Sequence, residues 1–492
     1  MSDRGLDLPA HVASLAPREL ADARRLARLV PAGAGAIEYR LDLATEKIPA
    51  SALLALDPRP VLVTWRSSRE GGSFTGSAEE YRTLVAQSYD AGAFVDVEHA
   101  SGLLSERDFL PDRRRVVSSA HFPFGLPPDA AELVEAMSAS GVLAAKLVAG
   151  AADLASSLQV AALQAVGRLG AAAVFPMGPA SAPGRVLSAH LGSALVFGSV
   201  EISTARGQLA LADLLEVYGT SRPRRPEALF GIVAADPAAS LSPRVHNALF
   251  RSRDLPWLYL PLPVADFDRE RPHELDGLPA PFHGFSVTRP WKEAAAGAGI
   301  PSEDVRACGA ANTLRFSRSR WRAENTDVDG IFDPLADHDT GEGRSAVVLG
   351  AGGTARAAIV AAKKIGYEVA VSSRRDDAAD ALGAEMKIDS VAWSDLPATE
   401  ADLYVNATPV GSSDEDPSAI PERVLDGRPL VFDCVYRQSG DTPTIAAARR
   451  FRCPFVTGMT MFAAQAVRQA RLFGIEDARL AEIEALLPGA AA

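Results

Sequence analysis

Eight short apolar segments, spaced along residues 11–200, constrain the fold of the first half of this chain more than any other feature. They are His11–Leu15, Ala36–Asp42, Val61–Arg66, Ala93–His99, Val116–His121, Leu143–Val148, Ala172–Met177 and Leu195–Val200. Alanine-rich segments with helical spacing separate most of them, such as Arg18–Val30 and Asp153–Arg168. Strands that alternate with helices pair in parallel through right-handed crossovers. Eight such strands predict a (β/α)8 barrel, with an open doubly wound sheet as the alternative.

The second half begins after Gly219–Pro226, a segment rich in proline and arginine that cannot continue a helix and indicates a linker. A new strand starts at Leu229, and polar loops and helices follow to about residue 325. Ala346–Gly350 then forms a buried-type strand that leads directly into a helix. Further strands are predicted at Glu368–Ser372, Asp402–Asn406 and Pro429–Asp433, and a last helix at Met461–Phe473. This pattern indicates a nucleotide-binding sheet within the second half.

Length and composition limit the function classes. A chain of 492 residues with 47% hydrophobic residues needs two or three cores. Its net charge of -12 argues against nucleic acid or an anionic membrane as the main partner. The three cysteines, which are widely spaced, fit neither a disulfide framework nor a zinc site, so we expect no metal. The segment MSDRGLDLPA shows no secretory signal, and we expect a cytoplasmic enzyme.

Charged side chains cluster near the ends of the predicted barrel strands, where such barrels hold their functional groups. They are Glu38, Arg40, Arg66, Glu98, His121 and Lys146. Lys146 lies among apolar neighbours in GVLAAKLVAG, where a lysine is costly unless it is neutral, paired or reacting. A free amine at such a position can attack a ketone and form a Schiff base. The alternative is a structural lysine whose stem reaches solvent.

Other polar residues of this half fit the same site. His121 could move a proton near neutral pH, and Glu98 could orient its imidazole. Arg40, Arg66 and Arg185 could bind a carboxylate and hydroxyl groups. Each residue alone could instead be structural, and only their joint placement favours a catalytic site.

This half resembles type I 3-dehydroquinate dehydratase through IEYRLD, TWRSSREGG, DVE, the SxH element at His121, AAKLV, MG followed by Arg185, and TARGQ. The resemblance implies that Lys146 forms the Schiff base, that His121 is the acid–base group, and that Glu98 holds His121. It also implies a substrate-binding set of Ser14, Glu38, Arg40, Arg66, Arg185, Thr204 and Gln208. The sequence departs from the family's pattern at Phe122, Gly184 and Arg206.

The turn Gly350-Ala351-Gly352-Gly353-Thr354-Ala355 fits the dinucleotide pattern G-x-G-x-x-G/A. It follows an apolar strand and opens a helix, so small residues can let the backbone approach a pyrophosphate. An ordinary tight strand–helix turn is the alternative. The next strand ends at Ser372 and is followed by Ser373, Arg374 and Arg375. Two arginines without an acid favour NADP over NAD.

Three polar motifs, SLSP, GFSVTRPWK and NTD, precede this turn. Lys292 and Asp327 within them could form an acid–base pair beside a carbonyl that receives hydride. A solvated helix face for Lys292 and a helix cap for Asp327 are the alternatives.

The second half resembles shikimate dehydrogenase through DPAASLSP, GFSVTRPWK, GAANT, ENTDVDG, LGAGGTARA, NATPVG, DCVY and GMTMFAAQA. The resemblance implies a two-lobed α/β dehydrogenase with Lys292 and Asp327 as the catalytic pair. It implies substrate contacts from Ser240, Ser242, Thr288, Asn312, Tyr436 and Gln465. It implies NADP contacts from Gly350, Gly352, Gly353, Thr354, Ala355, Ser373, Arg374, Arg375, Thr408 and Gly458. Ala239, Trp291, Arg437 and Ser286 depart from the pattern.

Together the halves predict a bifunctional enzyme with three domains. We expect a dehydratase barrel over residues 1–220, a substrate-binding domain over 227–325 with helices of 459–488 packed on it, and a Rossmann NADP-binding domain over 326–458. The expected substrates are 3-dehydroquinate, 3-dehydroshikimate and shikimate, and the chain is expected to be a monomer or homodimer. A catabolic quinate or shikimate dehydrogenase and a non-catalytic metabolite-sensing regulator are the alternatives.

Overall fold

The computed structural model describes residue 8 and residues 10–166, 169–338, 343–437 and 440–488. The chain divides into two compact units. The first comprises residues 1–229, 236–238 and 250–281, and the second comprises residues 230–235, 239–249 and 282–492. Among the described residues, every helix is too short or too polar to span a bilayer.

Eight parallel strands form a nearly closed barrel, as predicted, with hydrogen-bonded order β7-β6-β5-β4-β3-β2-β1-β8. The amide of Ala194, just before β8, donates to the carbonyl of Ala172 in β7 at 2.7 Å and brings the two ends of this sheet together. The strands are β1 (His11–Leu15), β2 (Ala36–Arg40), β3 (Val61–Thr64), β4 (Phe94–Glu98), β5 (Val116–Phe122), β6 (Ala144–Gly150), β7 (Ala172–Met177) and β8 (Val196–Ser199).

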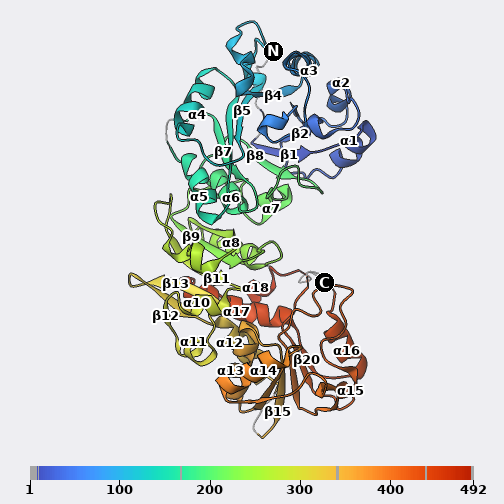
Figure 1. The fold of residues 1–492 in the computed structure, drawn as a ribbon, viewed down its shortest axis with the longest axis vertical. Coiled ribbons are helices and arrows are strands. Elements are labelled where there is room, and N and C mark those ends of the chain that lie inside the picture. Colours follow the sequence, from blue (N-terminus) through green and yellow to red (C-terminus); the bar gives the residue numbers. More distant parts are fainter. Residues whose placement is uncertain (1–7, 9, 167–168, 339–342, 438–439, 489–492) are drawn as a thin grey trace. The chain divides into compact units, whose positions relative to one another are not determined.

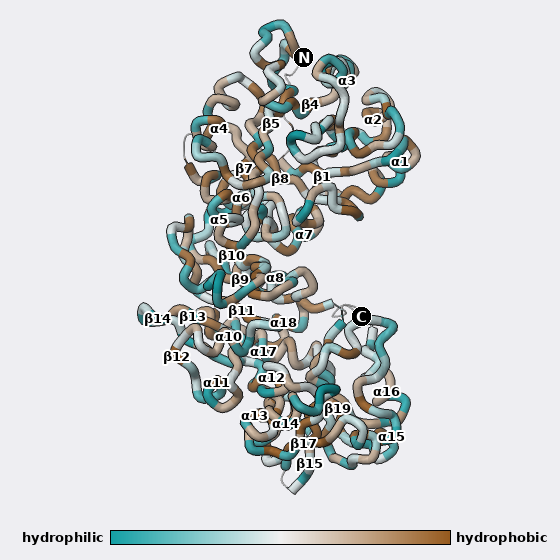
Figure 2. Tube along the Cα trace, in the orientation of Figure 1, coloured by the Kyte–Doolittle hydropathy of each residue, from teal (hydrophilic) through white to brown (hydrophobic). Residues whose placement is uncertain are grey.

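Helices surround these strands (Figure 1). Local signals start some of them: Ser77 caps α3 by accepting from Glu80 N–H, and Asp153 forms a capping box at α5 with Ser156. The helices are α1 (Leu20–Ala27), α2 (Ala50–Leu54), α3 (Ala78–Asp90), α4 (Ala130–Ala139), α5 (Leu154–Leu163), α6 (Ala182–His190) and α7 (Leu211–Glu216). In Figure 2 the barrel strands are browner, and thus more hydrophobic, than the helices around them.

Strand alternation positions the site within the barrel. Val12, Leu62 and Ala144 belong to one buried apolar cluster. Two residues further along the same strands, and so on the same face, lie Ser14, Thr64 and Lys146. The same step leads from Ala36 to Glu38, from Phe94 to Asp96 and from Val117 to Ser119. An apolar layer therefore lies beneath a polar layer that faces the carboxyl ends of the strands.

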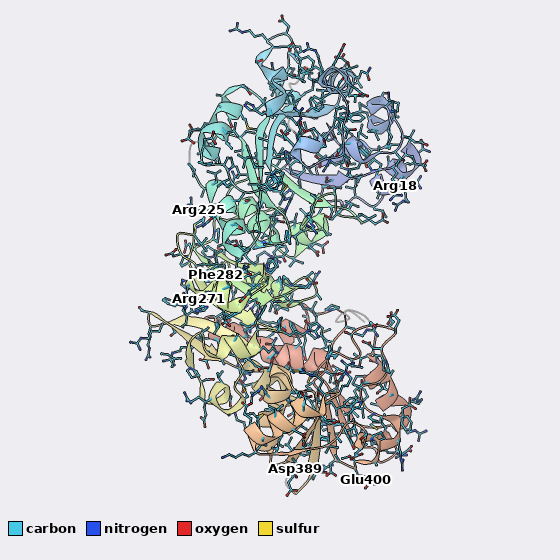
Figure 3. The ribbon with its side chains drawn as sticks, viewed as in Figure 1. Arg18, Arg225, Arg271, Phe282, Asp389 and Glu400 are labelled. Carbon is cyan, nitrogen blue, oxygen red and sulfur yellow. The ribbon has the colours of Figure 1, made fainter. Side chains whose placement is uncertain are left out.

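The predicted bounds of the barrel strands are close to the observed ones. His11–Leu15 and Ala172–Met177 are confirmed, whereas the strand predicted to reach Asp42 ends at Arg40 because Leu41–Leu43 forms a 3-10 turn. Lys146 lies three residues into β6 rather than at its end. The predicted linker Gly219–Pro226 contains no helix or strand, and Arg225 within it is exposed (Figure 3).

A second sheet follows, with order β10-β9-β11-β13-β14-β12. Its strands are β9 (Ala228–Ala234), β10 (Trp257–Pro263), β11 (Phe282–Val287), β12 (Ile300–Pro301), β13 (Thr313–Ser317) and β14 (Arg320–Glu324). The accompanying helices are α8 (Ser242–Ser252), α9 (Phe267–Glu270), α10 (Lys292–Ala296) and α11 (Glu303–Cys308). The antiparallel pair β11–β13 places Ser286 opposite Thr313.

The third sheet is entirely parallel, with order β17-β16-β15-β18-β19-β20, as a nucleotide-binding sheet should be. Its strands are β15 (Ser345–Leu349), β16 (Glu368–Ser372), β17 (Asp389–Ser390), β18 (Leu403–Asn406), β19 (Leu430–Asp433) and β20 (Phe455–Val456). Its helices are α12 (Thr326–Ala336), α13 (Gly353–Ile365), α14 (Asp376–Met386), α15 (Glu422–Leu425), α16 (Pro443–Phe451), α17 (Gly458–Leu472) and α18 (Leu480–Glu484). The order reverses beside β15, so the turn after β15 lies at the switch point where such sheets bind ligands.

Candidate active sites

A cavity of about 850 Å³ opens at the carboxyl ends of the barrel strands. Nine of the residues predicted for the first site line it: Ser14, Glu38, Arg40, Arg66, His121, Lys146, Arg185, Thr204 and Gln208. The tenth, Glu98, is buried and does not belong to the lining. The structure thus brings side chains from seven of the barrel strands, and from the loops after them, into one pocket.

Lys146 is buried and paired rather than surrounded by apolar groups. Its Nζ lies 3.0 Å from Asp96 Oδ2 and 3.6 Å from Glu38 Oε1, and 4.3 Å from the centre of the Phe197 ring. The apolar residues beside it in sequence, Ala145 and Leu147, point to the other face of β6 and pack against the helices outside. The amine is therefore held in one place inside the cavity.

A chain of hydroxyl and amide groups joins Glu38 to the loop after β8. Ser14 donates to Glu38 Oε2 at 2.5 Å, and the hydroxyls of Ser14 and Thr204 lie 2.8 Å apart. Thr204 donates to Gln208 Oε1 at 2.8 Å. Thr64 donates to the other Glu38 oxygen at 2.8 Å. This network can hold the hydroxyl groups of a polar ring, because most of its members both donate and accept.

The imidazole of His121 contacts Glu70, which corrects the predicted contact with Glu98. His121 Nδ1 and Glu70 Oε2 are 2.8 Å apart, whereas Glu98 accepts from Arg66 and from the amide of Ser67. Burial, with help from the cations Arg66 and Lys146, holds the pKa of His121 well below its ordinary value. Burial raises the pKa of Glu70 to about 8. The imidazole is thus neutral near pH 7 and is ready to accept a proton.

Arg66 is the centre of a buried charge network. Its guanidinium donates to Asp96 at 2.6 Å, to Glu70 at 3.2 Å and to Glu98 at 3.2 Å. Burial opposes ionisation of Asp96, yet Arg66 and Lys146 hold the pKa of this carboxyl below its usual range. Arg66 lines the cavity, but it donates to these carboxyl groups and to Ser119, so we expect it to hold the acids that surround His121 and Lys146 rather than to bind substrate.

Two other predicted arginines differ in their partners. Arg40 is paired with Asp42 through two hydrogen bonds of 2.8 Å and lies 3.4 Å from the Thr204 carbonyl. Arg185 is buried over the Phe175 ring, and its Nε has no hydrogen-bond partner. Burial lowers the pKa of Arg185 to about 10. A buried guanidinium without a carboxylate partner among the described residues is suited to bind a carboxylate from a ligand.

Packing explains one departure from the family's pattern, at Gly184. A Cβ at this position would lie 2.4 Å from the Ser157 carbonyl oxygen and 2.6 Å from Pro176 Cγ. Any side chain there would push α6 away from α5, so the glycine keeps Arg185 in place. Nothing in the structure explains Phe122 or Arg206 in the same way.

The second site is centred on Lys292, at the start of α10, and Asp327, in the first turn of α12. Lys292 Nζ donates to Asp327 Oδ2 at 2.5 Å. The other oxygen of this carboxylate accepts from Asn312 Nδ2 at 2.8 Å. Asn325 caps α12 and accepts from the amide of Asp327 at 3.1 Å. Hydrogen bonds therefore orient both members of the pair. Lys292 is not a solvated group and Asp327 is not a simple helix cap, which were the alternative interpretations of the sequence.

The other predicted substrate residues of this half lie partly in loops and partly on helices, with Gln465 in α17 and Ser242 at the start of α8. Gln465 accepts from Thr326, the neighbour of Asp327, at 3.1 Å, and Thr326 in turn contacts Asn312. Ser240 accepts from the amide of Ser242 at the start of α8. The amide of Thr288 donates to the Val233 carbonyl, which fixes the segment before Lys292. Burial raises the pKa of Tyr436, whose ring packs on Phe462.

The glycine turn after β15 fits a dinucleotide. Gly350 has φ +115°, which favours glycine, and its amide donates to the Ser372 carbonyl. A Cβ at Gly352 would meet nothing within 4 Å, so space for a ligand lies above this residue. The first amides of α13, from Gly353 to Ala355, lack intrahelical acceptors and can bind phosphate.

The remaining predicted cofactor residues surround this turn in different ways. Ser373, Arg374 and Arg375 follow β16, and the two arginines are exposed and have no ion pair among the described residues. Thr408 bonds to Asn406 at the end of β18. At Gly458 a Cβ would lie 2.3 Å from the Val435 carbonyl oxygen, so this glycine permits close packing of α17. The residues present fit NADP, which would lie against Gly350–Ala355 with its 2′-phosphate near Arg374 and Arg375.

Three residues that bond to groups in or beside the two sites escaped the sequence prediction. Glu70 lies four residues after Arg66 in a 3-10 turn, where no strand or helix pattern marks it. Asp96 could have been found, because strand alternation puts it on the same face as Glu98. Gln469 lies one helical turn after Gln465 and bonds to Ser286 at 2.6 Å and to Thr313 at 2.7 Å.

Comparison with known proteins agrees with both family resemblances. The shikimate dehydrogenase (NADP(+)) of Oleidesulfovibrio alaskensis is 32% identical over 280 residues, which cover 55% of this chain and 98% of that protein. The family model "Shikimate dehydrogenase substrate binding domain" matches residues 232–314. The chain belongs to the shikimate dehydrogenase family. The family model "Type I 3-dehydroquinase" matches residues 11–224, so the chain also carries a type I 3-dehydroquinase barrel.

Two further proteins are similar to this chain, one over most of its length and one over its second half. A bifunctional 3-dehydroquinate dehydratase/shikimate dehydrogenase of Arabidopsis thaliana, described as chloroplastic, is 28% identical over 477 residues, which cover 90% of this chain and 78% of that protein. A crystal structure of shikimate 5-dehydrogenase from Thermus thermophilus, in complex with NADP(H) and shikimate, covers 53% of this chain and 98% of its own. Its sequence identity is 30% and its TM-score is 0.47.

Proposed function

We propose that this chain catalyses two consecutive reactions, dehydration of 3-dehydroquinate to 3-dehydroshikimate and reduction of 3-dehydroshikimate to shikimate with NADPH. One observation carries the proposal. Each half places the lysine amine that we predict to be catalytic against a carboxylate, Lys146 with Asp96 and Lys292 with Asp327.

In the barrel, the Lys146 amine would attack the substrate ketone, and loss of water would form an iminium ion. The neutral imidazole of His121 would remove a proton from the adjacent carbon and give an enamine. The enamine would expel the hydroxyl of the next carbon, which leaves as water with the proton held by His121. Hydrolysis of the iminium would release the product and the free amine. Arg185 would bind the carboxylate, while Glu38, Ser14, Thr204 and Gln208 would bind the ring hydroxyls.

In the second half, bound NADPH supplies a hydride to the ketone carbon. The Lys292 ammonium would hold the ketone oxygen and give it a proton, and Asp327 would orient the ammonium. Asn312 and Gln465 would keep Asp327 and Thr326 in position through the contacts described above. Arg374 and Arg375 support NADP rather than NAD, since no acid follows β16 at their place.

The finer assignments belong to the same proposal. We infer three domains, over residues 1–220, 227–325 and 326–458, each built on one of the three sheets, with α17 returning to the second through Gln469, Ser286 and Thr313. The chain would act in the cytoplasm as a monomer or homodimer on small molecules alone, without nucleic-acid or membrane partners.

A coupled assay tests the proposal. The purified chain, given 3-dehydroquinate and NADPH, should form a transient enone absorbance and consume NADPH. Lys146→Ala should stop dehydration but still reduce added 3-dehydroshikimate, and Lys292→Ala should accumulate the enone. Borohydride should trap a covalent adduct on Lys146 that is absent from Lys146→Ala. Trapping that persists in this variant would refute the imine assignment, and rates with quinate or NADH above those with shikimate or NADPH would favour the catabolic alternative.

A further inference from the structure

The catalytic lysine of the dehydrogenase half touches the nucleotide-binding turn through one side chain, that of Thr354. Lys292 Nζ donates to Thr354 Oγ1 at 2.9 Å, in addition to its bond with Asp327. Thr354 is the second residue of α13 and lies 62 positions away from Lys292 in sequence. The contact joins the segment that carries the substrate residues to the segment that binds NADP.

The backbone is adapted to this contact at Gly353. A Cβ at that position would lie 2.8 Å from Lys292 Cβ and 3.1 Å from Lys292 Cδ. The lysine stem therefore lies directly against the turn, and any residue larger than glycine would displace it. This close approach is an observation separate from the hydrogen bond to Thr354. Both indicate that the nucleotide-binding turn fixes the position of Lys292.

We propose that Thr354 is a positioning residue, whose hydroxyl orients the Lys292 ammonium and couples nucleotide binding to substrate binding. This inference rests on the proposed reductase function. An ammonium has three donors. Asp327 and Thr354 accept two of them, and the third has no acceptor among the residues that the structure describes. Two acceptors on different elements fix the direction of the third donor, which remains for the ketone oxygen.

The hydroxyl of Thr354 explains the coupling. Because Thr354 Oγ1 accepts from Lys292, its own hydrogen must point elsewhere. The free amides of the first turn of α13 favour an anion on this side of the helix. A phosphate oxygen of the nucleotide would accept that hydrogen, fix the hydroxyl rotamer and so fix the lysine. By linkage, a substrate bound to Lys292 would tighten nucleotide binding by the same factor by which the bound nucleotide tightens substrate binding.

The test uses the full chain and three substitutions. Thr354→Val removes the hydroxyl and keeps the shape, and Thr354→Ala repeats the removal if the second methyl of valine crowds Lys292. Thr354→Ser keeps the hydroxyl. Thr399→Val is the matched control, because Thr399 lies in the same lobe and donates to the Asp395 carbonyl at 3.0 Å.

Two readouts are needed, one of them independent of turnover. Steady-state rates give kcat and the KM for each substrate. Calorimetry gives the affinity for shikimate without nucleotide and with saturating NADPH, a pair that cannot react. The dehydratase rate of the same chain reports whether the barrel is folded, and thermal unfolding of each variant reports whether the dehydrogenase half is folded.

The wild-type chain and Thr354→Ser should bind shikimate more tightly with NADPH and should agree in kcat within about threefold. Thr354→Val and Thr354→Ala should lose about 10- to 100-fold in kcat, the loss expected for one hydrogen bond to a charged group. Their shikimate affinity should become independent of NADPH, while Thr399→Val and all dehydratase rates remain unchanged.

Three results would overturn the inference. The first is a valine variant with wild-type kcat and wild-type coupling. The second is a serine variant as impaired as the valine variant, which would assign the effect to packing. The third is a loss confined to the KM for NADPH, which would make Thr354 a nucleotide ligand alone. A wild-type chain that reduces no 3-dehydroshikimate would instead refute the proposed function itself.

Discussion

Two buried arginines of the barrel should respond in opposite ways to the same substitution. Arg66 is 3% exposed and is bonded to three carboxylates, those of Asp96, Glu70 and Glu98. Arg185 is 8% exposed and has no ion pair among the described residues. Methionine retains most of the apolar stem of arginine and removes the charge. Arg66→Met should therefore destabilise the barrel, whereas Arg185→Met should not.

The magnitudes follow from the two environments. Removing Arg66 leaves buried carboxylates without their main cation, which costs about 3–5 kcal/mol in comparable sites. For a domain of this size that loss lowers the Tm by about 10 °C. The pKa of Arg185 falls from 12.5 to about 10 on folding, so its charged form costs stability at any pH below that value, on the order of 3 kcal/mol. Arg185→Met should be as stable as the wild type or more stable, by up to about 3 kcal/mol.

The effects of the two substitutions on substrate binding should have the reverse order, with the larger effect from Arg185→Met. Arg185→Met removes the proposed carboxylate ligand, and the KM for 3-dehydroquinate should rise about 10- to 100-fold. Hydrogen exchange of the full chain, followed by mass spectrometry, can report barrel stability through peptides of β4 and β5, with peptides of β15 as an internal reference. If Arg66→Met kept wild-type protection and raised only the KM, Arg66 would be a substrate ligand and the network argument would be wrong. If Arg185→Met lost protection as strongly as Arg66→Met, the burial argument would fail.

Three further predictions address the acid–base groups and the cofactor. Glu70→Gln should lower the kcat of dehydration about 10- to 100-fold. Because folding raises the pKa of Glu70 from 4.5 to about 8, the contribution of Glu70 to stability is complete below pH 4.5 and is lost as the pH rises through 8. The Tm of the variant should therefore depend less on pH over that window than the Tm of the wild type, and an equal dependence in both proteins would contradict the assignment. Asp327→Asn should lower the kcat of reduction at least about 100-fold while NADPH binding, measured by fluorescence, and dehydration stay unchanged; a normal rate would remove Asp327 from the mechanism. Arg374→Ser combined with Arg375→Ser should raise the KM for NADPH about 10-fold or more and leave the KM for NADH unaltered, whereas an equal change for both cofactors would speak against 2′-phosphate recognition.

The barrel and its polar layer could be predicted because they depend on local periodicity. Apolar strands alternate with helices, and the period of two residues along each strand decides which side chains face inward. Strand position alone therefore made Lys146 and His121 candidates, and the structure places both in one cavity. The predicted environment of Lys146 was wrong in one respect. Its apolar neighbours in sequence face outward, and its neighbours in space are Asp96 and Glu38.

The missing parts depend on contacts between segments that are distant in sequence or irregular in structure. Glu70 reaches His121 across 51 positions from a 3-10 turn, and no pattern in the sequence specifies where such a turn points. His121 contacts Glu70 and not the predicted Glu98, because Glu98 accepts hydrogen bonds from Arg66 and from the amide of Ser67. The contact of Lys292 with Thr354 likewise requires the packing of α10 on α13, which only the folded chain shows.

Charge balance within the barrel cavity explains how a protein with a net charge of -12 can bind an acid. Arg40 is neutralised by Asp42, whereas Arg66 and Lys146 share the charges of Asp96, Glu98 and Glu38. Arg185 is the buried cavity cation that has no such partner among the described residues, and its lowered pKa reflects the free-energy cost of burying that charge. A substrate carboxylate would complete the pair and recover that free energy on binding. The arginine that weakens the free protein is therefore the one that we propose selects its ligand, as expected where function is maintained at the expense of stability.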